Sequence, residues 1–102
     1  MTDYIIIFHP KAEIEFLEAF EWYEERLEGL GFRFETCVER RLKAITAAPL
    51  IYPLKNYNCR ESKVEDFPFL VVYKLYPRKR TLLIISIFHT SRKPDRKYKK
   101  KL

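Results

Sequence analysis

Two apolar stripes with helical spacing, separated by the only two glycines of the chain, constrain the fold most strongly. Between residues 11 and 28, large apolar side chains recur at steps of four, three and four, which places them on one face of an α-helix. These side chains are Phe16, Phe20, Tyr23 and Leu27. Glutamates occupy the other face. We therefore predict an amphipathic helix over residues 11–28.

A second helical stripe follows directly. Its apolar residues, spaced at four, four and three, are Phe34, Val38, Leu42 and Ile45. Pro49 ends this pattern, because proline cannot continue a helix interior. Gly29 and Gly31 lie between the two stripes, where a positive φ can end the first helix and allow a tight reversal. The two helices are therefore expected to form a hairpin.

The other regular segments are extended. Residues 4–8 (YIIIF) form a short, nearly continuous apolar run, which predicts a strand covered on both sides or placed centrally in a sheet. Residues 58–64 alternate in polarity, and residues 69–76 and 81–89 are rich in β-branched residues. The polar turn at residues 77–80 joins the last two segments, so an antiparallel hairpin is their simplest connection.

The predicted order of elements is β-α-α-β-β-β. We expect a two-layer α+β domain, in which the helical hairpin packs on a mainly antiparallel sheet. At 102 residues the chain has room for one such domain, placed at residues 1–91, with residues 92–102 as its basic tail. No apolar run approaches the roughly 20 residues of a membrane span, and the start of the chain lacks signal-peptide features. A cytoplasmic protein with no membrane partner is expected.

Charge is distributed unevenly along the chain. Residues 92–102 contain seven bases and one acid, and therefore account for the whole net charge of +6. Residues 10–48 contain nine acids and six bases, whereas residues 49–91 contain seven bases and three acids. The helical half is thus acidic and the strand half basic, which favours an anionic partner for the strand half.

Candidate anion-binding residues lie mainly in the strand half. The sequence contains no Gly-rich phosphate loop, HExxH, GxSxG elbow or paired-cysteine site, so we expect no cofactor and no metal. His9 and His89 each end a β-rich segment, where histidine can act as a general acid or base or can simply cap the sheet. Arg60 and Arg92 are stronger phosphate-binding candidates than the terminal lysines, because a guanidinium binds two oxygens at once.

Two further pairs of residues have an ordinary structural interpretation. Trp22 and Tyr23 could form a stacking platform for nucleic-acid bases, but aromatic residues at helical spacing more often belong to the core. Cys37 and Cys59 lack the spacing of a metal site or a redox motif, which predicts two free thiols.

Four segments together form a family pattern. They are WYEERLEGLGFRF (22–34), AAPLIYP (47–53), CRESKVEDFPFLVVY (59–73) and IISIFHTSRKP (84–94). In this order they resemble the RelE/ParE toxin superfamily, and most closely its ParE-like, plasmid-stabilisation branch. The resemblance implies the same β-α-α-β-β-β fold and a toxin of a bacterial two-gene toxin–antitoxin module. It also implies a cognate antitoxin that neutralises the toxin through an extended segment, which we expect to be acidic and amphipathic.

The superfamily has two target classes, which need different residues. RelE-like members cleave messenger RNA on the ribosome. The resemblance implies that Lys63, Arg92 and Tyr98 match three of their catalytic residues. Glu61 and Leu70 stand where a second lysine and a strand arginine would be expected. These two departures weaken the ribonuclease interpretation.

ParE-like members inhibit DNA gyrase and lack this catalytic set. The FPF motif (67–69) and the HxxRxP ending (89–94) favour this branch. We therefore expect a toxin that blocks DNA gyrase or another replication target. Its expected binding residues are Arg60, His89, Arg92 and Lys93. The alternative is a ribosome-dependent mRNA endoribonuclease. A third possibility is an inactive member of the superfamily that keeps only antitoxin binding. Whether the chain is an enzyme stays open.

Overall fold

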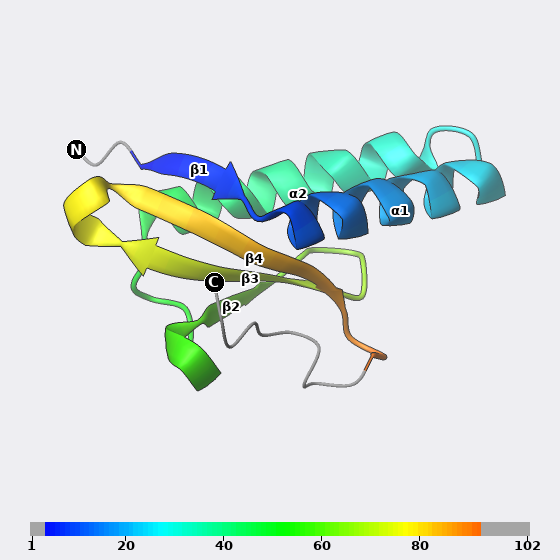
Figure 1. Cartoon of the computed structure of the whole chain (residues 1–102). Coiled ribbons are helices and arrows are strands. Elements are labelled where there is room, and N and C mark those ends of the chain that lie inside the picture. The colour runs from blue at the N-terminus through cyan, green and yellow to red at the C-terminus, as the bar shows by residue number, and fades with distance from the viewer. Residues whose placement is uncertain (1–3, 93–102) are drawn as a thin grey trace.

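The computed structural model describes residues 4–92, in which a helical hairpin covers one face of a four-stranded sheet (Figure 1). The elements are β1 (Ile5–Phe8), α1 (Pro10–Arg26), α2 (Leu30–Ala47), the 3₁₀ turn η1 (Asn56–Asn58), β2 (Arg60–Lys63), β3 (Phe69–Tyr76), the 3₁₀ turn η2 (Pro77–Lys79) and β4 (Thr81–His89). The strand order is β1-β4-β3-β2, with β1 parallel to β4 and the other neighbours antiparallel. The predicted α+β class, element order and mainly antiparallel sheet are confirmed.

The prediction for β1 is wrong in one respect, because this strand lies at an edge of the sheet and is covered on one face. It pairs with β4 alone. Side chains of a strand point alternately to the two faces, so Ile6 and Phe8 pack into the core beneath the helices. Ile5 and Ile7 point to the other face, where both are exposed. An unbroken apolar run does not reveal which strands pair beside it.

The turn between the helices uses its two glycines for different reasons. Gly29 has a left-handed φ of 89°, as predicted. Gly31 lies inside α2, where a Cβ atom would be 2.6 Å from the carbonyl oxygen of Phe20, so glycine is needed for close approach. The Glu24 carboxylate accepts hydrogen bonds from the backbone N–H groups of Gly29 (2.8 Å) and Gly31 (2.9 Å) and caps α2. Leu27, predicted on the buried stripe, follows the end of α1 and is exposed.

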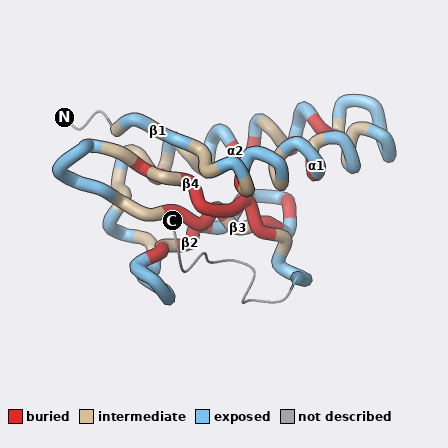
Figure 2. The backbone as a smooth tube through the Cα atoms, viewed as in Figure 1, coloured by how far each residue is buried: buried red, intermediate tan, exposed pale blue. Residues whose placement is uncertain are grey.

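An aromatic cluster fills the core between the helices and the sheet. Tyr23 of α1 and Phe34 of α2 each contact the rings of Phe67 and Phe69, with centroids 4.9–6.2 Å apart. The FPF motif therefore supplies core side chains. Figure 2 shows the buried positions concentrated along the middle of β3 and β4. Both helices are amphipathic, and within residues 4–92 no helix is long and apolar enough to cross a membrane.

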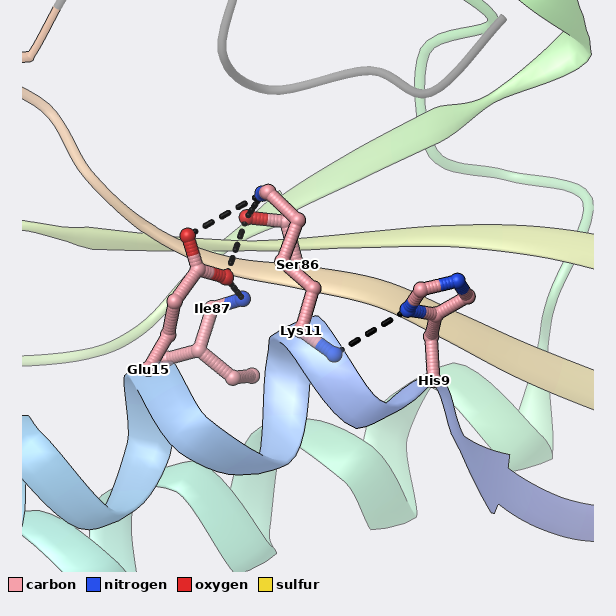
Figure 3. Close-up of polar contacts among 5 residues, drawn as sticks. All are labelled: His9, Lys11, Glu15, Ser86 and Ile87. Atoms are coloured by element: carbon pink, nitrogen blue, oxygen red, sulfur yellow. Dashed lines mark hydrogen bonds and ion pairs between the residues drawn. The ribbon is translucent and has the colours of Figure 1, made fainter. Parts of the chain in front are cut away.

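Both β1 and α1 lie along the outer edge of β4. β1 pairs with residues 81–84, and α1 runs beside the remainder. There the Glu15 carboxylate accepts hydrogen bonds from the Ile87 backbone N–H (3.0 Å) and from the Ser86 hydroxyl (2.7 Å) (Figure 3). The Lys11 ammonium donates to both Glu15 (3.0 Å) and Ser86 (3.1 Å). These bonds hold α1 against the C-terminal half of β4.

Candidate target-binding groove

A groove of about 570 Å³ lies between α1 and the C-terminal end of β4. Its α1 wall is formed by Glu15, Glu18, Ala19, Trp22 and Tyr23. Its opposite wall is formed by Pro68, Phe69, Ile87, His89, Ser91 and Arg92. The groove thus brings together two of the four predicted target-binding residues, His89 and Arg92.

A short turn after β4 places these two residues. The backbone N–H of Arg92 donates to the His89 carbonyl (3.0 Å), and the backbone N–H of Ser91 donates to His89 Nδ1 (3.1 Å). Because Nδ1 accepts this bond, a neutral imidazole carries its proton on Nε2. The His89 ring also meets the Phe69 ring edge-on, with centroids 5.0 Å apart. His89 is therefore held in one orientation, and Arg92 follows it at the rim.

The structure separates the two adjacent aromatic residues of α1. Tyr23 belongs to the core cluster, as the ordinary interpretation of this pair predicts. Trp22 is 52% exposed and lines the groove. The Arg26 guanidinium lies 3.5 Å from the Trp22 ring centroid, and the Tyr23 ring meets the Trp22 ring edge-on. Trp22 therefore presents a braced aromatic wall opposite the turn that holds His89.

The two walls of the groove carry opposite charges. Glu18 on α1 is negative, and Arg92 on the facing wall is positive. The Glu15 carboxylate is already engaged by β4 and Lys11. A ligand that is anionic throughout would meet Glu18 opposite Arg92, whereas a protein segment with mixed charge complements both walls. The groove thus suits a mixed-charge protein segment better than a nucleic-acid backbone.

A third predicted target-binding residue, Arg60, lies away from this groove. Arg60 begins β2 and pairs with Tyr73. Tyr73 lies four residues along β3 from Phe69, a distance of roughly 14 Å along the strand. The Arg60 guanidinium donates to the carbonyl oxygens of Leu50 (3.2 Å) and Tyr52 (2.8 Å), so it braces the loop before β2. Lys93 lies outside the described residues, as does Tyr98.

Lys63, a predicted ribonuclease residue, lies on the opposite face of the sheet from the groove. It pairs with Leu70, and Leu70 pairs with Phe88, so these three side chains share one face. Phe88 belongs to the buried cluster on the face without helices, whereas His89 contacts Phe69 on the helical side. The Lys63 ammonium donates to the carbonyl oxygens of Val64 (3.2 Å) and Phe67 (3.4 Å).

The surroundings of Lys63 are poor in positive charge. Glu61 points to the same face, two residues earlier in β2, and is 9% exposed. Leu70 and Phe88 are apolar. Among the described residues of this part of the sheet, Lys63 therefore stands beside a carboxylate and apolar groups. A phosphate in the transition state of RNA cleavage needs several cations aimed at its oxygens.

Two groove-lining residues carry a recognisable signal in the sequence: Glu18, which was not predicted, and Trp22, which was considered as a stacking platform but assigned more readily to the core. Together with Glu15 and Ala19 they occupy steps of three and four on α1 and form a second stripe beside the predicted apolar one. The signal was hidden because two of the four are charged, so hydropathy alone assigns them to solvent. Pro68 was recognised as part of the FPF motif, but its place beside His89 depends on the pairing of β3 with β4.

The remaining candidates have structural positions. His9 precedes α1 and its Nδ1 accepts a hydrogen bond from the Lys11 backbone N–H (3.0 Å), which caps the helix (Figure 3). Cys37 and Cys59 are buried free thiols, as predicted. Burial raises the pKa of the Cys59 thiol, Lys74 opposes this and Glu61 adds to it, so Cys59 stays protonated at neutral pH. Within residues 4–92, no three His, Cys, Asp or Glu side chains gather as a metal site would require.

Comparison with protein families gives one match that spans most of the chain. Residues 6–94 match the family described as "ParE toxin of type II toxin-antitoxin system, parDE". A comparison with curated protein sequences finds no match.

Solved structures with the same fold include members of two toxin–antitoxin systems. The chromosomal ParDE system from P. aeruginosa aligns with a TM-score of 0.70 at 14% identity, covering 86% of this chain and 97% of that chain. The intact E. coli RelBE toxin–antitoxin complex aligns with a TM-score of 0.61 at 20% identity, covering 88% and 100%. The isolated E. coli RelE toxin aligns with a TM-score of 0.59 at 18% identity, covering 92% of each chain. At these identities the likeness shows a shared fold.

Proposed function

Because the chain belongs to the ParE toxin family of type II toxin–antitoxin systems, we propose that it arrests growth by binding a replication protein, with DNA gyrase as the first target to test. The groove beside His89 and Arg92 is the proposed binding site. The observation that carries this choice is the opposite charge of its walls, Glu18 against Arg92. An RNA backbone would bring negative charge to both walls, whereas a protein surface can complement each.

The alternative function is ribosome-dependent cleavage of messenger RNA by Lys63, Arg92 and Tyr98. It is supported by the fold shared with E. coli RelE and by the presence of all three residue types in this chain. Against it, Lys63 lies on the opposite sheet face from the groove and its neighbours on that face are Glu61 and Leu70. We therefore rank this alternative second.

The second partner we propose is a cognate antitoxin. The structural neighbours include the ParDE system and the RelBE complex, in which a toxin is described together with an antitoxin. The positive charge of this chain favours an acidic antitoxin. Gyrase and ribosomes are both cytoplasmic, so we propose that the toxin acts there.

Pulse labelling after induced expression distinguishes the two targets. In one bacterial culture, incorporation of labelled thymidine and of labelled methionine is followed over the first minutes. A replication target predicts that thymidine incorporation falls first. Methionine incorporation falling first would instead place the target on the ribosome, and unchanged incorporation of both labels would contradict toxicity in that host.

A matched pair of substitutions tests the groove itself. Replacing Arg92 with Ala removes the cation of the groove rim, and we expect the toxin concentration needed to inhibit gyrase supercoiling to rise about tenfold. Lys63→Ala removes an equal charge from the opposite sheet face and should leave inhibition within about twofold. If Lys63→Ala instead abolishes RNA cleavage on ribosomes, the ribonuclease alternative is correct.

A further inference from the structure

The loop between α2 and β2 exposes an unusual number of large apolar side chains. They are Leu50 (65% exposed), Ile51 (72%), Leu54 (56%) and Tyr57 (47%). All four lie within eight consecutive residues, and we call them the loop patch. Single exposed apolar residues are normal, but four of them within one short surface loop are typical of a protein-binding surface.

The loop that carries this patch is firmly held. The Tyr73 hydroxyl donates to the Pro49 carbonyl (2.6 Å), and Arg60 donates to the carbonyls of Leu50 and Tyr52. The Glu61 backbone N–H donates to the Pro53 carbonyl (3.2 Å), and Leu54 forms an antiparallel bridge with Arg60, so the loop pairs with the start of β2. Exposure of the patch is therefore built into an ordered backbone. A preordered surface loses little conformational freedom when a partner binds.

The end of the loop also holds a strained backbone. Tyr57 and Asn58 have φ values of 57° and 60°, and neither is a glycine. A left-handed conformation is a genuine outlier for a bulky aromatic residue. Hydrogen bonds from Lys55 N–H to the Cys59 carbonyl and from Cys59 N–H to the Asn56 carbonyl close the turn around it. Strain of this kind clusters at binding sites, and here it coincides with an aromatic side chain that is 47% exposed.

The charge around the loop patch identifies the chemistry of a partner. Residues 40–60 contain five bases and no acid. These bases are Arg40, Arg41, Lys43, Lys55 and Arg60. In contrast, the opposite end of the hairpin is acidic, with Glu24, Glu25 and Glu28 around the turn. A partner segment that pairs apolar side chains with carboxylates complements both the patch and its surroundings.

We propose that the loop patch is a docking surface for an acidic, amphipathic segment of the antitoxin, separate from the groove that binds the target. This inference rests on the proposed function, because it names the site of the antitoxin proposed there. The patch lies near the start of β2, whereas the groove lies at the end of β4 beside Phe69. Substitutions in the patch should therefore weaken antitoxin binding and leave toxicity unchanged.

The test uses the purified full-length toxin, and its probe is the small acidic protein that a two-gene module would encode next to it. Ile51→Asp places a carboxylate at the most exposed side chain of the patch, and we expect the Kd measured by calorimetry to rise at least tenfold. Ile14→Asp is the matched control, because Ile14 is an exposed isoleucine on α1 outside the patch. Its Kd should stay within about threefold of the wild-type value.

Three further readouts separate the possible failures. In cells, Ile51→Asp should still arrest growth, but co-expression of the antitoxin should no longer restore it. Amide exchange of the wild-type complex should show new protection across residues 50–57. If the wild type binds the neighbouring protein while Ile51→Asp binds equally well and these amides gain no protection, the inference fails and the proposed function survives. If the wild-type toxin does not bind the neighbouring protein, the antitoxin partner named under the proposed function is wrong as well. If the toxin instead dimerises through Ile51, a second copy of the chain is the occupant of the loop patch.

Discussion

At the scale of the residue, Tyr73 shows how one side chain ties a loop to the sheet. Its ring is fully buried on β3 and its hydroxyl donates to the Pro49 carbonyl (2.6 Å) just after α2. Burial raises the pKa of Tyr73 to about 12, while the nearby Arg60 lowers it and Tyr52 raises it. The phenol therefore stays a hydrogen-bond donor well above neutral pH.

Replacing Tyr73 with Phe should lower the free energy of unfolding by about 1–2 kcal/mol at pH 7. The substitution keeps the ring but removes the donor to a carbonyl that has been withdrawn from water. Urea denaturation followed by circular dichroism measures the difference. Tyr76→Phe, at an exposed tyrosine of the same strand, is the control and should change stability by less than about 0.5 kcal/mol.

The same pair of variants has a defined pH dependence. The pKa of Tyr73 is higher in the folded state, at about 12, than its ordinary value of 10.0, so the unfolded chain loses the proton first. The stabilisation by Tyr73 is therefore complete below pH 10 and declines as the pH rises towards 12. The wild type should lose its advantage over Tyr73→Phe across this interval. An advantage that stays constant from pH 9 to 12 would contradict the buried-phenol explanation.

At the scale of the element, α1 occupies the position of an edge strand along half of β4 and supplies a hydrogen-bond acceptor there. β1 supplies backbone partners up to residue 84, and the Glu15 carboxylate then satisfies the Ile87 N–H (Figure 3). The carboxylate also accepts from the Ser86 hydroxyl, which is fully buried. A helix laid against a sheet edge in this way blocks unwanted strand pairing and forms one wall of the groove.

Glu15→Ala should therefore destabilise the protein by about 2–3 kcal/mol. The substitution leaves the Ile87 N–H and the Ser86 hydroxyl without their acceptor and the Lys11 ammonium without its carboxylate. Glu21→Ala changes the same residue type at an exposed position of α1 and should cost less than about 0.5 kcal/mol. Equal unfolding midpoints in urea for the two variants would show that α1 is held by apolar packing alone.

At the scale of the whole molecule, the two proposed binding surfaces lie at different ends of the sheet. The groove is beside the end of β4, and the loop patch is beside the start of β2. Their chemistry differs as well, because the groove has walls of opposite charge whereas residues 40–60 carry bases and no acid. Target and antitoxin can therefore be distinguished by substitution, which a single shared surface would not allow.

The C-terminal lysines are expected to contribute charge more than specificity. Deleting residues 99–102 removes three lysines and lowers the net charge from +6 to +3. We expect toxicity, measured as growth arrest per amount of induced protein, to fall only modestly, because a run of lysines attracts any polyanion without selecting one. A truncated protein that keeps the wild-type melting temperature yet has no toxicity would show that this segment carries the function.

How far the candidate site could be predicted depends on the distance along the chain that each inference spans. His89 and Arg92 are three residues apart, so the HxxRxP pattern was enough to predict them as neighbours. Arg60 was grouped with them because it shares the positive charge of Arg92, but β3 pairing places it about 14 Å away along the strand. Glu18 was not predicted, and Trp22 was assigned to the core more readily than to a binding site, because their place opposite His89 depends on where α1 crosses β4.

The sequence by itself determined the helical hairpin, the order of the elements and the membership of the two-layer α+β class. These properties follow from local periodicity, since each helix or strand repeats its buried residues at the spacing of its own backbone. Only the tertiary structure decided that β1 lies at an edge, that Lys63 and His89 point to opposite faces, and that α1 completes the edge of β4. Strand order and the facing of paired side chains arise from contacts between segments far apart in the chain, which no local pattern encodes.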